Sequence, residues 1–318
     1  MHFDVFNGDA DGLCALHQLR LSDPRDATLV TGAKRDIRLL NRVSAVAGDT
    51  ITVLDIALAA NAASLVALLQ TGISVEYFDH HFAGAIPVHP ALVTHIDTAP
   101  EVCTGVIVDR VLQGRHRPWA IAAAFGDTLH HTANKLADTL NMPAQARKTV
   151  REVGEALAYN AYGDCEADLI IHPAALYAKI RPYADPLVFA AEQGIVARIT
   201  ATMASDLAEA RDAARQIAVG GHVAILLPDA AWSRRVRAAI GNELAAQFPE
   251  RAHAVVVPAG PDALTVSVRA PVSRPYGAAA LCARFPEGGG REAAAGINHL
   301  PSTSFDAFLA TFAAAFPR

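Results

Sequence analysis

Two acidic side chains lie close together in the segment Asn-Gly-Asp-Ala-Asp-Gly at residues 7–12. Asp9 and Asp11 are two residues apart, and Gly8 and Gly12 beside them favour a tight turn. Carboxylate oxygens held in this way are the ligands that hard divalent cations require. The segment therefore predicts a site for a divalent metal ion.

The same segment also resembles the start of an EF-hand calcium-binding loop, but the rest of that motif is missing. The twelfth position of an EF-hand loop is a glutamate, and the corresponding residue here is Gln18. Residues 3–6, which precede the segment, form an apolar run typical of a strand, whereas a helix precedes an EF-hand loop. We therefore reject the EF-hand interpretation.

Further carboxylate and imidazole side chains follow in the chain: Asp55 after residues 50–54, Asp79-His80-His81 after residues 74–78, and Gly126-Asp127 before His130 and His131. Taken alone, each has a structural explanation, because an aspartate after a strand often caps the next helix. Together they indicate chemistry, since ligands bind beyond the carboxyl ends of parallel strands. These ligands suit Mn²⁺, with Mg²⁺ and Co²⁺ as alternatives. Two such ions can activate a water and stabilise a leaving oxygen in phosphoryl transfer.

The elements that must position these residues alternate between strands and helices in the first half of the chain. Strands are predicted at residues 3–6, 50–54 and 74–78, and helices at residues 12–21 and 61–70. This alternation predicts a parallel α/β sheet with right-handed crossovers. A helical pattern follows over residues 119–162.

The second half opens on an alanine-rich stretch, residues 185–218, that predicts one long helix between two domains. Strands are then predicted at residues 222–227, 254–258 and 264–269, with a helix at 233–247. The predicted fold class is α/β. We expect a parallel-sheet catalytic domain at residues 1–190, a helical linker at 191–219 and a smaller α/β domain at 220–318.

Composition limits the partners of the protein. A chain of 318 residues predicts two domains, and the net charge of -5 argues against broad basic surfaces for long nucleic acid. The net charge does not exclude a short anionic substrate, because a bound metal ion can override the negative charge near it. The four cysteines form no CxxC pair, the N-terminal residues are too polar for a signal peptide, and no apolar run reaches about 20 residues. We therefore expect a cytoplasmic protein without membrane contact.

The acidic and histidine segments resemble, in order, the motifs of the DHH family of phosphoesterases, which includes RecJ-type exonucleases and bacterial nano-RNases. Residues 7–12 resemble its first motif, Asp55 the second, residues 79–81 the third and Asp127 the fourth. Residues 288–296, Gly-Gly-Gly-Arg-Glu-Ala-Ala-Ala-Gly, resemble the GGGHxxAAG motif of the DHHA1 domain that usually follows. The DHHA1 likeness argues against the pyrophosphatase branch of the family.

The resemblance implies a role for each matching residue. Asp9 is expected to bind one Mn²⁺ and Asp11 the other, with Asp55 bridging the two ions, and His80 and Asp127 are expected to complete the shell of the second. The resemblance further implies that Asp79 orients neighbouring ligands and that His81 contacts the phosphate. Substrate contacts are expected from Arg269, Gly289, Gly290 and Arg291 of the second domain, and from His130 or His131 of the first.

The chain departs from the family pattern in two motifs, the first motif and the DHHA1 motif. Many relatives have a histidine four residues before the first aspartate, where this chain has Val5. Asn7 stands where RecJ-type members have an aspartate, and its neutral oxygen is expected to hold the first metal more weakly. Arg291 stands where the DHHA1 motif has histidine, and a guanidinium suits phosphate well.

The sequence therefore predicts an enzyme that hydrolyses a phosphate ester in a short nucleotide, such as an oligoribonucleotide, a dinucleotide or a phosphorylated adenosine. One alternative is a nucleotide-binding regulatory module with weakened catalysis, because the first-motif histidine is missing. Another is a polyphosphate hydrolase. A homodimer and the preferred metal stay open at this point.

Overall fold

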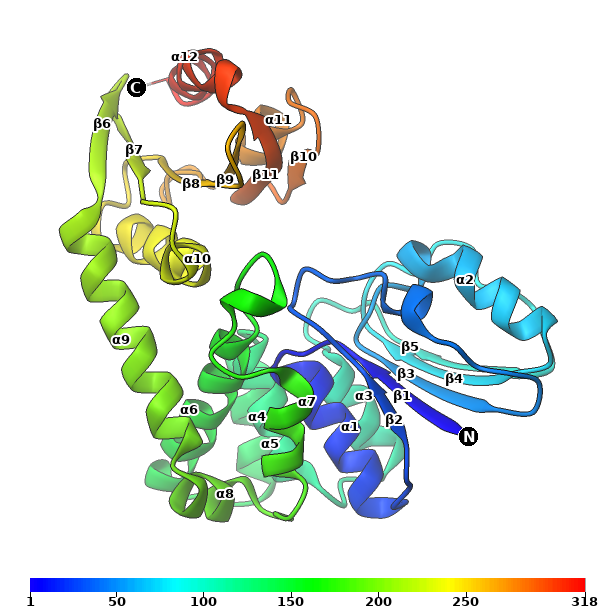
Figure 1. Cartoon of the computed structure of the whole chain (residues 1–318). Coiled ribbons are helices and arrows are strands. Elements are labelled where there is room, and N and C mark those ends of the chain that lie inside the picture. Colours follow the sequence, from blue (N-terminus) through cyan, green and yellow to red (C-terminus); the bar gives the residue numbers. More distant parts are fainter. Residues whose placement is uncertain (318) are drawn as a thin grey trace. The chain divides into compact units, whose positions relative to one another are not determined.

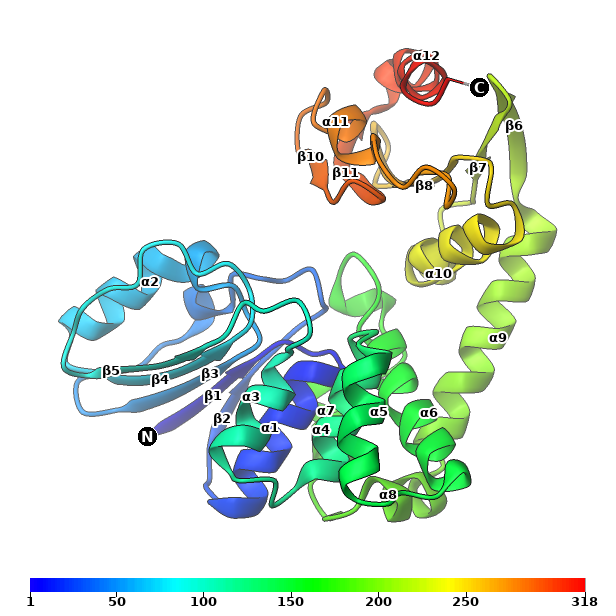
Figure 2. The ribbon, with the colours of Figure 1, turned by 180° about the vertical axis from the view of Figure 1, so that it is seen from behind.

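The structure, a computed structural model, describes residues 1–317. The chain divides into two compact units, Met1–Ala201 and a second unit that begins at Thr202. Each unit combines one β-sheet with helices (Figure 1, Figure 2). The predicted α/β class is confirmed in both units.

The sheet of the first unit has five parallel strands in the order β2-β1-β3-β4-β5. Their bounds are β1 His2–Phe6, β2 Thr28–Val30, β3 Thr50–Leu54, β4 Ser74–Asp79 and β5 Leu92–Ile96. The three predicted strands are confirmed as β1, β3 and β4, and they lie side by side. Their carboxyl ends therefore meet at one edge, as parallel strands require.

Alternate side chains of these strands face opposite sides of the sheet. Val5, Val53 and Tyr77 belong to one hydrophobic cluster together with Leu58 and Leu65 of helix α2, Leu58–Gln70. Helices α1 (Ala10–Ser22) and α3 (Thr104–Val111) cover the other face (Figure 1). Helices therefore cover both faces of the sheet, and the last three residues of β1, β3 and β4 are buried.

The remaining helices of the first unit pack on α1 or on one another. The helical pattern at residues 119–162 forms three helices, and two more follow: α4 Arg117–Gly126, α5 His130–Thr139, α6 Ala144–Asn160, α7 Pro173–Ile180 and α8 Pro186–Gln193. Helix α4 packs against both α1 and α6. This places the carboxyl end of α4, and Asp127 directly after it, beside the start of α1.

The predicted helix at residues 185–218 is wrong as a single element. It breaks at Gly194, which has a left-handed backbone with φ 64°, and α8 meets α9 (Ile195–Ala213) at an angle of 74°. Residues 215–219, expected in the helical linker, form strand β6 instead. Among residues 1–317, no single helix is long and apolar enough to cross a membrane, although the bent pair α8 and α9 together has the length and composition.

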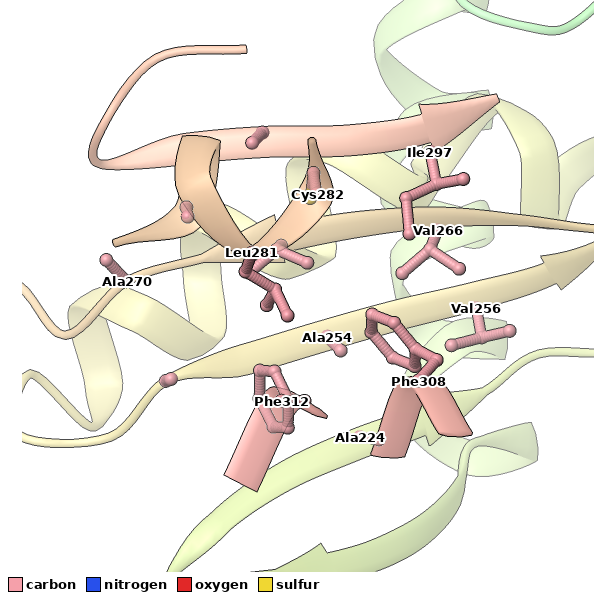
Figure 3. Packing of buried hydrophobic residues seen from close by; sticks show 14 of the residues in the cluster. Ala224, Ala254, Val256, Val266, Ala270, Leu281, Cys282, Ile297, Phe308 and Phe312 are labelled. Carbon is pink, nitrogen blue, oxygen red and sulfur yellow. The ribbon is translucent and has the colours of Figure 1, made fainter. Parts of the chain in front are cut away.

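The second unit contains a mixed sheet in the order β10-β11-β9-β8-β7-β6, in which only β7 and β8 run parallel. Its elements are β6 Arg215–Val219, β7 His222–Leu226, α10 Ala231–Gln247, β8 His253–Pro258, β9 Ala263–Arg269, α11 Ala278–Cys282, β10 Gly288–Gly290, β11 Ala294–Pro301 and α12 Phe305–Ala315. Phe308 and Phe312 of α12 pack on sheet residues such as Val256 and Val266 (Figure 3). These contacts form the core on one face of this sheet.

Acid should weaken the first unit through His17 on α1. The His17 ring is buried against Trp119, and its Nε2 lies 2.7 Å from the Tyr183 carbonyl oxygen. Burial lowers the pKa of His17 to about 4. Because the unfolded chain keeps a histidine pKa of about 6.5, the neutral ring contributes stability above that pH, and this contribution is lost as the pH falls from about 6.5 towards 4.

We therefore expect His17 to lower the free energy of unfolding, measured in urea, by about 2 kcal/mol at pH 5.0 relative to pH 7.5. In His17→Gln, whose amide does not titrate, this part of the pH dependence should disappear. An equal pH dependence in the wild type and the variant would show that His17 is not the titrating group.

Candidate metal centre

The first motif forms the turn between β1 and α1. Asp9 caps α1, because its Oδ1 accepts hydrogen bonds from the backbone N–H groups of Asp11 and Gly12 at 3.0 and 3.2 Å. Gly12 is required there, since a Cβ on it would lie 2.2 Å from the Asn7 carbonyl oxygen. The glycines thus allow the turn to close, and the aspartates face the carboxyl edge of the sheet.

Asp11 is held by the first turn of α3. Both of its carboxylate oxygens accept a backbone hydrogen bond of 2.7 Å, Oδ2 from Thr104 and Oδ1 from Gly105. The positive end of the helix dipole favours a carboxylate at this position. These amide donors were not predicted, because a backbone N–H leaves no signal in the residue types.

Asp55 follows β3 directly and has a left-handed backbone with φ 59°. Its N–H donates to the Phe78 carbonyl oxygen on the neighbouring strand, and its Oδ1 accepts from the Thr104 hydroxyl at 3.2 Å. Aspartate and asparagine tolerate this backbone conformation better than most residues. The conformation turns the Asp55 carboxylate towards the other ligands.

The third motif brings two imidazoles to the same place. His80 Nε2 lies 3.5 Å from Asp55 Oδ1 and 3.9 Å from both Asp11 Oδ2 and Asp127 Oδ2. Asp79 Oδ1 accepts hydrogen bonds from the His81 backbone N–H and from His81 Nδ1, at 3.1 and 2.7 Å. Asp79 itself is fully buried. The bond to Asp79 fixes the orientation of the half-exposed His81 ring, and the expected role of Asp79 stays a prediction.

The carboxylates repel one another in this buried cluster. Burial and the neighbouring Asp11 and Asp9 carboxylates raise the pKa of Asp55 well above its usual value. Burial and Asp11 likewise raise the pKa of Asp127 to about 6. Burial favours the neutral ring of His81, but the hydrogen bond to Asp79 outweighs it and raises the His81 pKa. A cation among these carboxylates would relieve the repulsion.

Two overlapping groups of side chains could each hold a metal ion. One group is Asp11, His80 and Asp127, and the other is Asp55, His80 and His81. Within each group, the ligand atoms all lie within 4.8 Å of one another. Carboxylates with one or two imidazoles fit a divalent ion such as Mn²⁺. The structure thus brings together five predicted residues: Asp11, Asp55, His80, His81 and Asp127. Asp9 and Asn7 lie beside them, and Asn7 Oδ1 accepts from the Asp9 N–H at 3.2 Å.

Lys34 was not predicted as a site residue, yet its ammonium lies among these carboxylates. Lys34 Nζ donates to Asp9 Oδ2 at 2.6 Å and lies 3.8 Å from Asp127 Oδ1. Burial favours a neutral amine, but the Asp9 and Asp127 carboxylates raise the pKa of Lys34 well above its usual value. Lys34 follows the end of β2, at the same sheet edge as the other residues. That position is the signal that could have revealed it.

Other predicted substrate residues lie outside this cluster. His130 and His131 are exposed at the start of α5, and His130 lines a separate hollow with Asn134 and Arg147. Arg269 ends β9 and donates from Nε to Asn242 Oδ1 at 2.6 Å.

The glycine segment of the second unit forms an exposed hairpin edge. Gly289 and Gly290 lie in β10, which pairs antiparallel with β11, and Arg291 is exposed directly after β10. A Cβ on Gly289 would meet no atom within 4 Å. The substrate roles of these residues stay predictions.

No family model and no curated protein matches this sequence. Solved structures do match its fold. Exonuclease RecJ bound to manganese aligns with a TM-score of 0.61 at 17% identity, covering 99% of this chain and 91% of that one. RecJ from Thermus thermophilus in complex with Mn²⁺ gives 0.55 at 17% identity, covering 99% of this chain and 52% of the longer RecJ chain.

A third match is the pGpG-specific phosphodiesterase PggH from Vibrio cholerae, with a TM-score of 0.56 at 13% identity over 98% of this chain and 99% of that one. The expected fold is therefore confirmed: the chain has the two-domain α/β fold of the DHH phosphoesterases. The likeness covers both units of the chain.

Proposed function

We propose that this protein is a metal-dependent phosphoesterase that hydrolyses phosphate esters in short nucleotides. The observation that carries the proposal is the convergence of Asp11, Asp55, His80 and Asp127 at the carboxyl edge of a parallel sheet. The solved structures with this fold include a manganese-bound exonuclease and a pGpG-specific phosphodiesterase. Both act on phosphodiesters, which supports the same class of reaction here.

Asp11, Asp55, His80 and Asp127 would hold the divalent ion, for which Mn²⁺ is the proposed identity. The bound ion supplies a Lewis acid that lowers the pKa of a water and stabilises negative charge on the phosphate. Asp79 keeps a proton on His81 Nδ1 and so fixes the ring for contact with a phosphate oxygen. Because 43% of the His81 side chain is exposed, a substrate reaches it from solvent.

The net charge of -5 favours a short substrate over a long nucleic acid. Arg269 and Arg291 of the second unit are the proposed phosphate contacts, since a guanidinium pairs well with phosphate oxygens. A 5′-phosphorylated dinucleotide is a short anionic substrate that carries one phosphodiester bond. We therefore propose the dinucleotide as the test substrate.

A substrate panel tests the proposed class. Metal-stripped full-length protein, reloaded with Mn²⁺, is incubated with 5′-phosphorylated diadenylate, adenosine 3′,5′-bisphosphate and short polyphosphate, and the products are separated by chromatography. We expect the dinucleotide to be cleaved fastest, giving mononucleotides. Turnover of polyphosphate alone would contradict the proposal that the substrate is a nucleotide. If none of the three compounds is turned over with Mn²⁺ bound, the proposal that the protein is a phosphoesterase is contradicted.

A further inference from the structure

We propose that the Lys34 ammonium replaces one of the two metal ions, so that the centre holds a single divalent ion beside a fixed positive charge. This inference rests on the proposed function and concerns the number of ions at the same site. Lys34 places an ammonium group among the carboxylates of this site. Its ammonium lies 2.6 Å from Asp9 Oδ2 and 3.8 Å from Asp127 Oδ1.

Both oxygens of the Asp9 carboxylate are already engaged by this chain. Oδ1 caps α1 by accepting from the backbone N–H groups of Asp11 and Gly12, and Oδ2 accepts from Lys34. A metal ion at Asp9 would have to displace the ammonium, and neither candidate ligand group includes Asp9.

The neighbouring residues of the first motif add no metal ligand. The Val5 side chain is fully buried in the hydrophobic cluster between the sheet and α2, and it has no atom that could bind a metal ion. Asn7 Oδ1 accepts from the Asp9 N–H, and Asn7 Nδ2 donates to the Lys34 carbonyl oxygen at 3.5 Å. Asn7 therefore links the Asp9 turn to the loop that carries Lys34, and this link favours the Lys34–Asp9 ion pair.

The two candidate ligand groups share one imidazole. Both candidate groups depend on His80, and an imidazole nitrogen has a single lone pair, so His80 Nε2 binds one ion. Asp11, Asp55 and Asp127 surround that nitrogen at 3.5–3.9 Å. One divalent ion and the Lys34 ammonium would together offset most of the charge of the four clustered aspartates.

Metal stoichiometry tests this directly. Metal-stripped full-length protein is titrated with Mn²⁺ by calorimetry, and the bound ion is examined by electron paramagnetic resonance. We expect one Mn²⁺ per wild-type chain, with the hyperfine pattern of an isolated ion. In Lys34→Met, Asp9 is released and a repelling charge is removed, so Mn²⁺ should bind about tenfold more tightly or in more than one equivalent. Lys34→Arg keeps the charge and should behave as the wild type.

Each other outcome decides a different point. Two ions per wild-type chain with a spin-coupled spectrum would overturn the single-ion centre and leave the phosphoesterase proposal intact. One ion in the wild type with unchanged stoichiometry and affinity in Lys34→Met would overturn the role of Lys34. No Mn²⁺ bound by the wild type would overturn the proposed function itself. Circular dichroism of each variant checks that it folds. If Lys34→Met does not fold, the number of ions bound by the wild type and by Lys34→Arg, which keeps the ion pair, still tests the single-ion centre.

Discussion

Asp55→Asn should lower Mn²⁺-dependent turnover on the order of a thousandfold while leaving the metal-free protein at least as stable as the wild type. Turnover falls because the amide has no charge to bind the ion. Stability is kept because asparagine tolerates the left-handed backbone at φ 59° and its oxygen can still accept from the Thr104 hydroxyl. The loss of one negative charge also relieves repulsion from Asp9 and Asp11.

The measurement combines initial rates with Mn²⁺ present and thermal unfolding without metal. Asp97→Asn is the matched control, because Asp97 also directly follows a parallel strand of this sheet but pairs with Arg110 at the surface. It should retain wild-type turnover. If Asp55→Asn kept full turnover, Asp55 would not be a ligand, and if it lost both turnover and stability, the carboxylate would be structural.

Gly126→Ala should destabilise the protein by about 3 kcal/mol or more and weaken Mn²⁺ binding as well. A Cβ on Gly126 would lie 2.3 Å from the Ala10 Cβ and 2.8 Å from the Gly154 carbonyl oxygen. The methyl group must therefore push α4 away from both α1 and α6. Because Ala10 lies between Asp9 and Asp11, and Asp127 directly follows Gly126, the same displacement separates metal ligands.

Urea unfolding and a Mn²⁺ titration measure the two effects. Gly241→Ala is the control, since Gly241 is also a buried helical glycine but a Cβ there would meet Val255 at an ordinary 3.5 Å. That change should be neutral or stabilise by about 0.5–1 kcal/mol through helix propensity. Equal stability of Gly126→Ala and the wild type would show that α4 does not need its close approach to α1.

The central part of the fold could be predicted because its strands carry apolar residues up to the carboxyl edge of the sheet. Residues 50–54 end in Val53 and Leu54, residues 74–78 end in Tyr77 and Phe78, and an aspartate directly follows each run. The order of β1, β3 and β4 in the sheet then brings their motifs together. Asp55 and His80 of the candidate metal centre were identified in this way, because their side-chain types and their positions after strands both carry information.

The features of the fold and site that were not predicted leave weaker signals in the sequence. Strand β2 has only three residues, none of them buried, so neither it nor Lys34 after it was predicted. Strand β6 was assigned to a helix because its stretch is rich in alanine, although Gly220 and Gly221 follow it with φ 59° and 92°. Two consecutive left-handed glycines are typical of a hairpin turn, and that pattern could have indicated the β6–β7 pair.

The most direct test of the account is whether cleavage of a phosphodiester depends on the metal and on the ligands that would hold it. Metal-stripped wild type, His80→Ala and Asp127→Ala are each incubated with 5′-phosphorylated diadenylate, first without metal and then with Mn²⁺. We predict no release of adenosine 5′-phosphate without metal, rapid release by the wild type after Mn²⁺ is added, and a loss of about a thousandfold or more in both variants. Cleavage by stripped wild type, or undiminished Mn²⁺-dependent cleavage by folded His80→Ala and Asp127→Ala, would contradict the account.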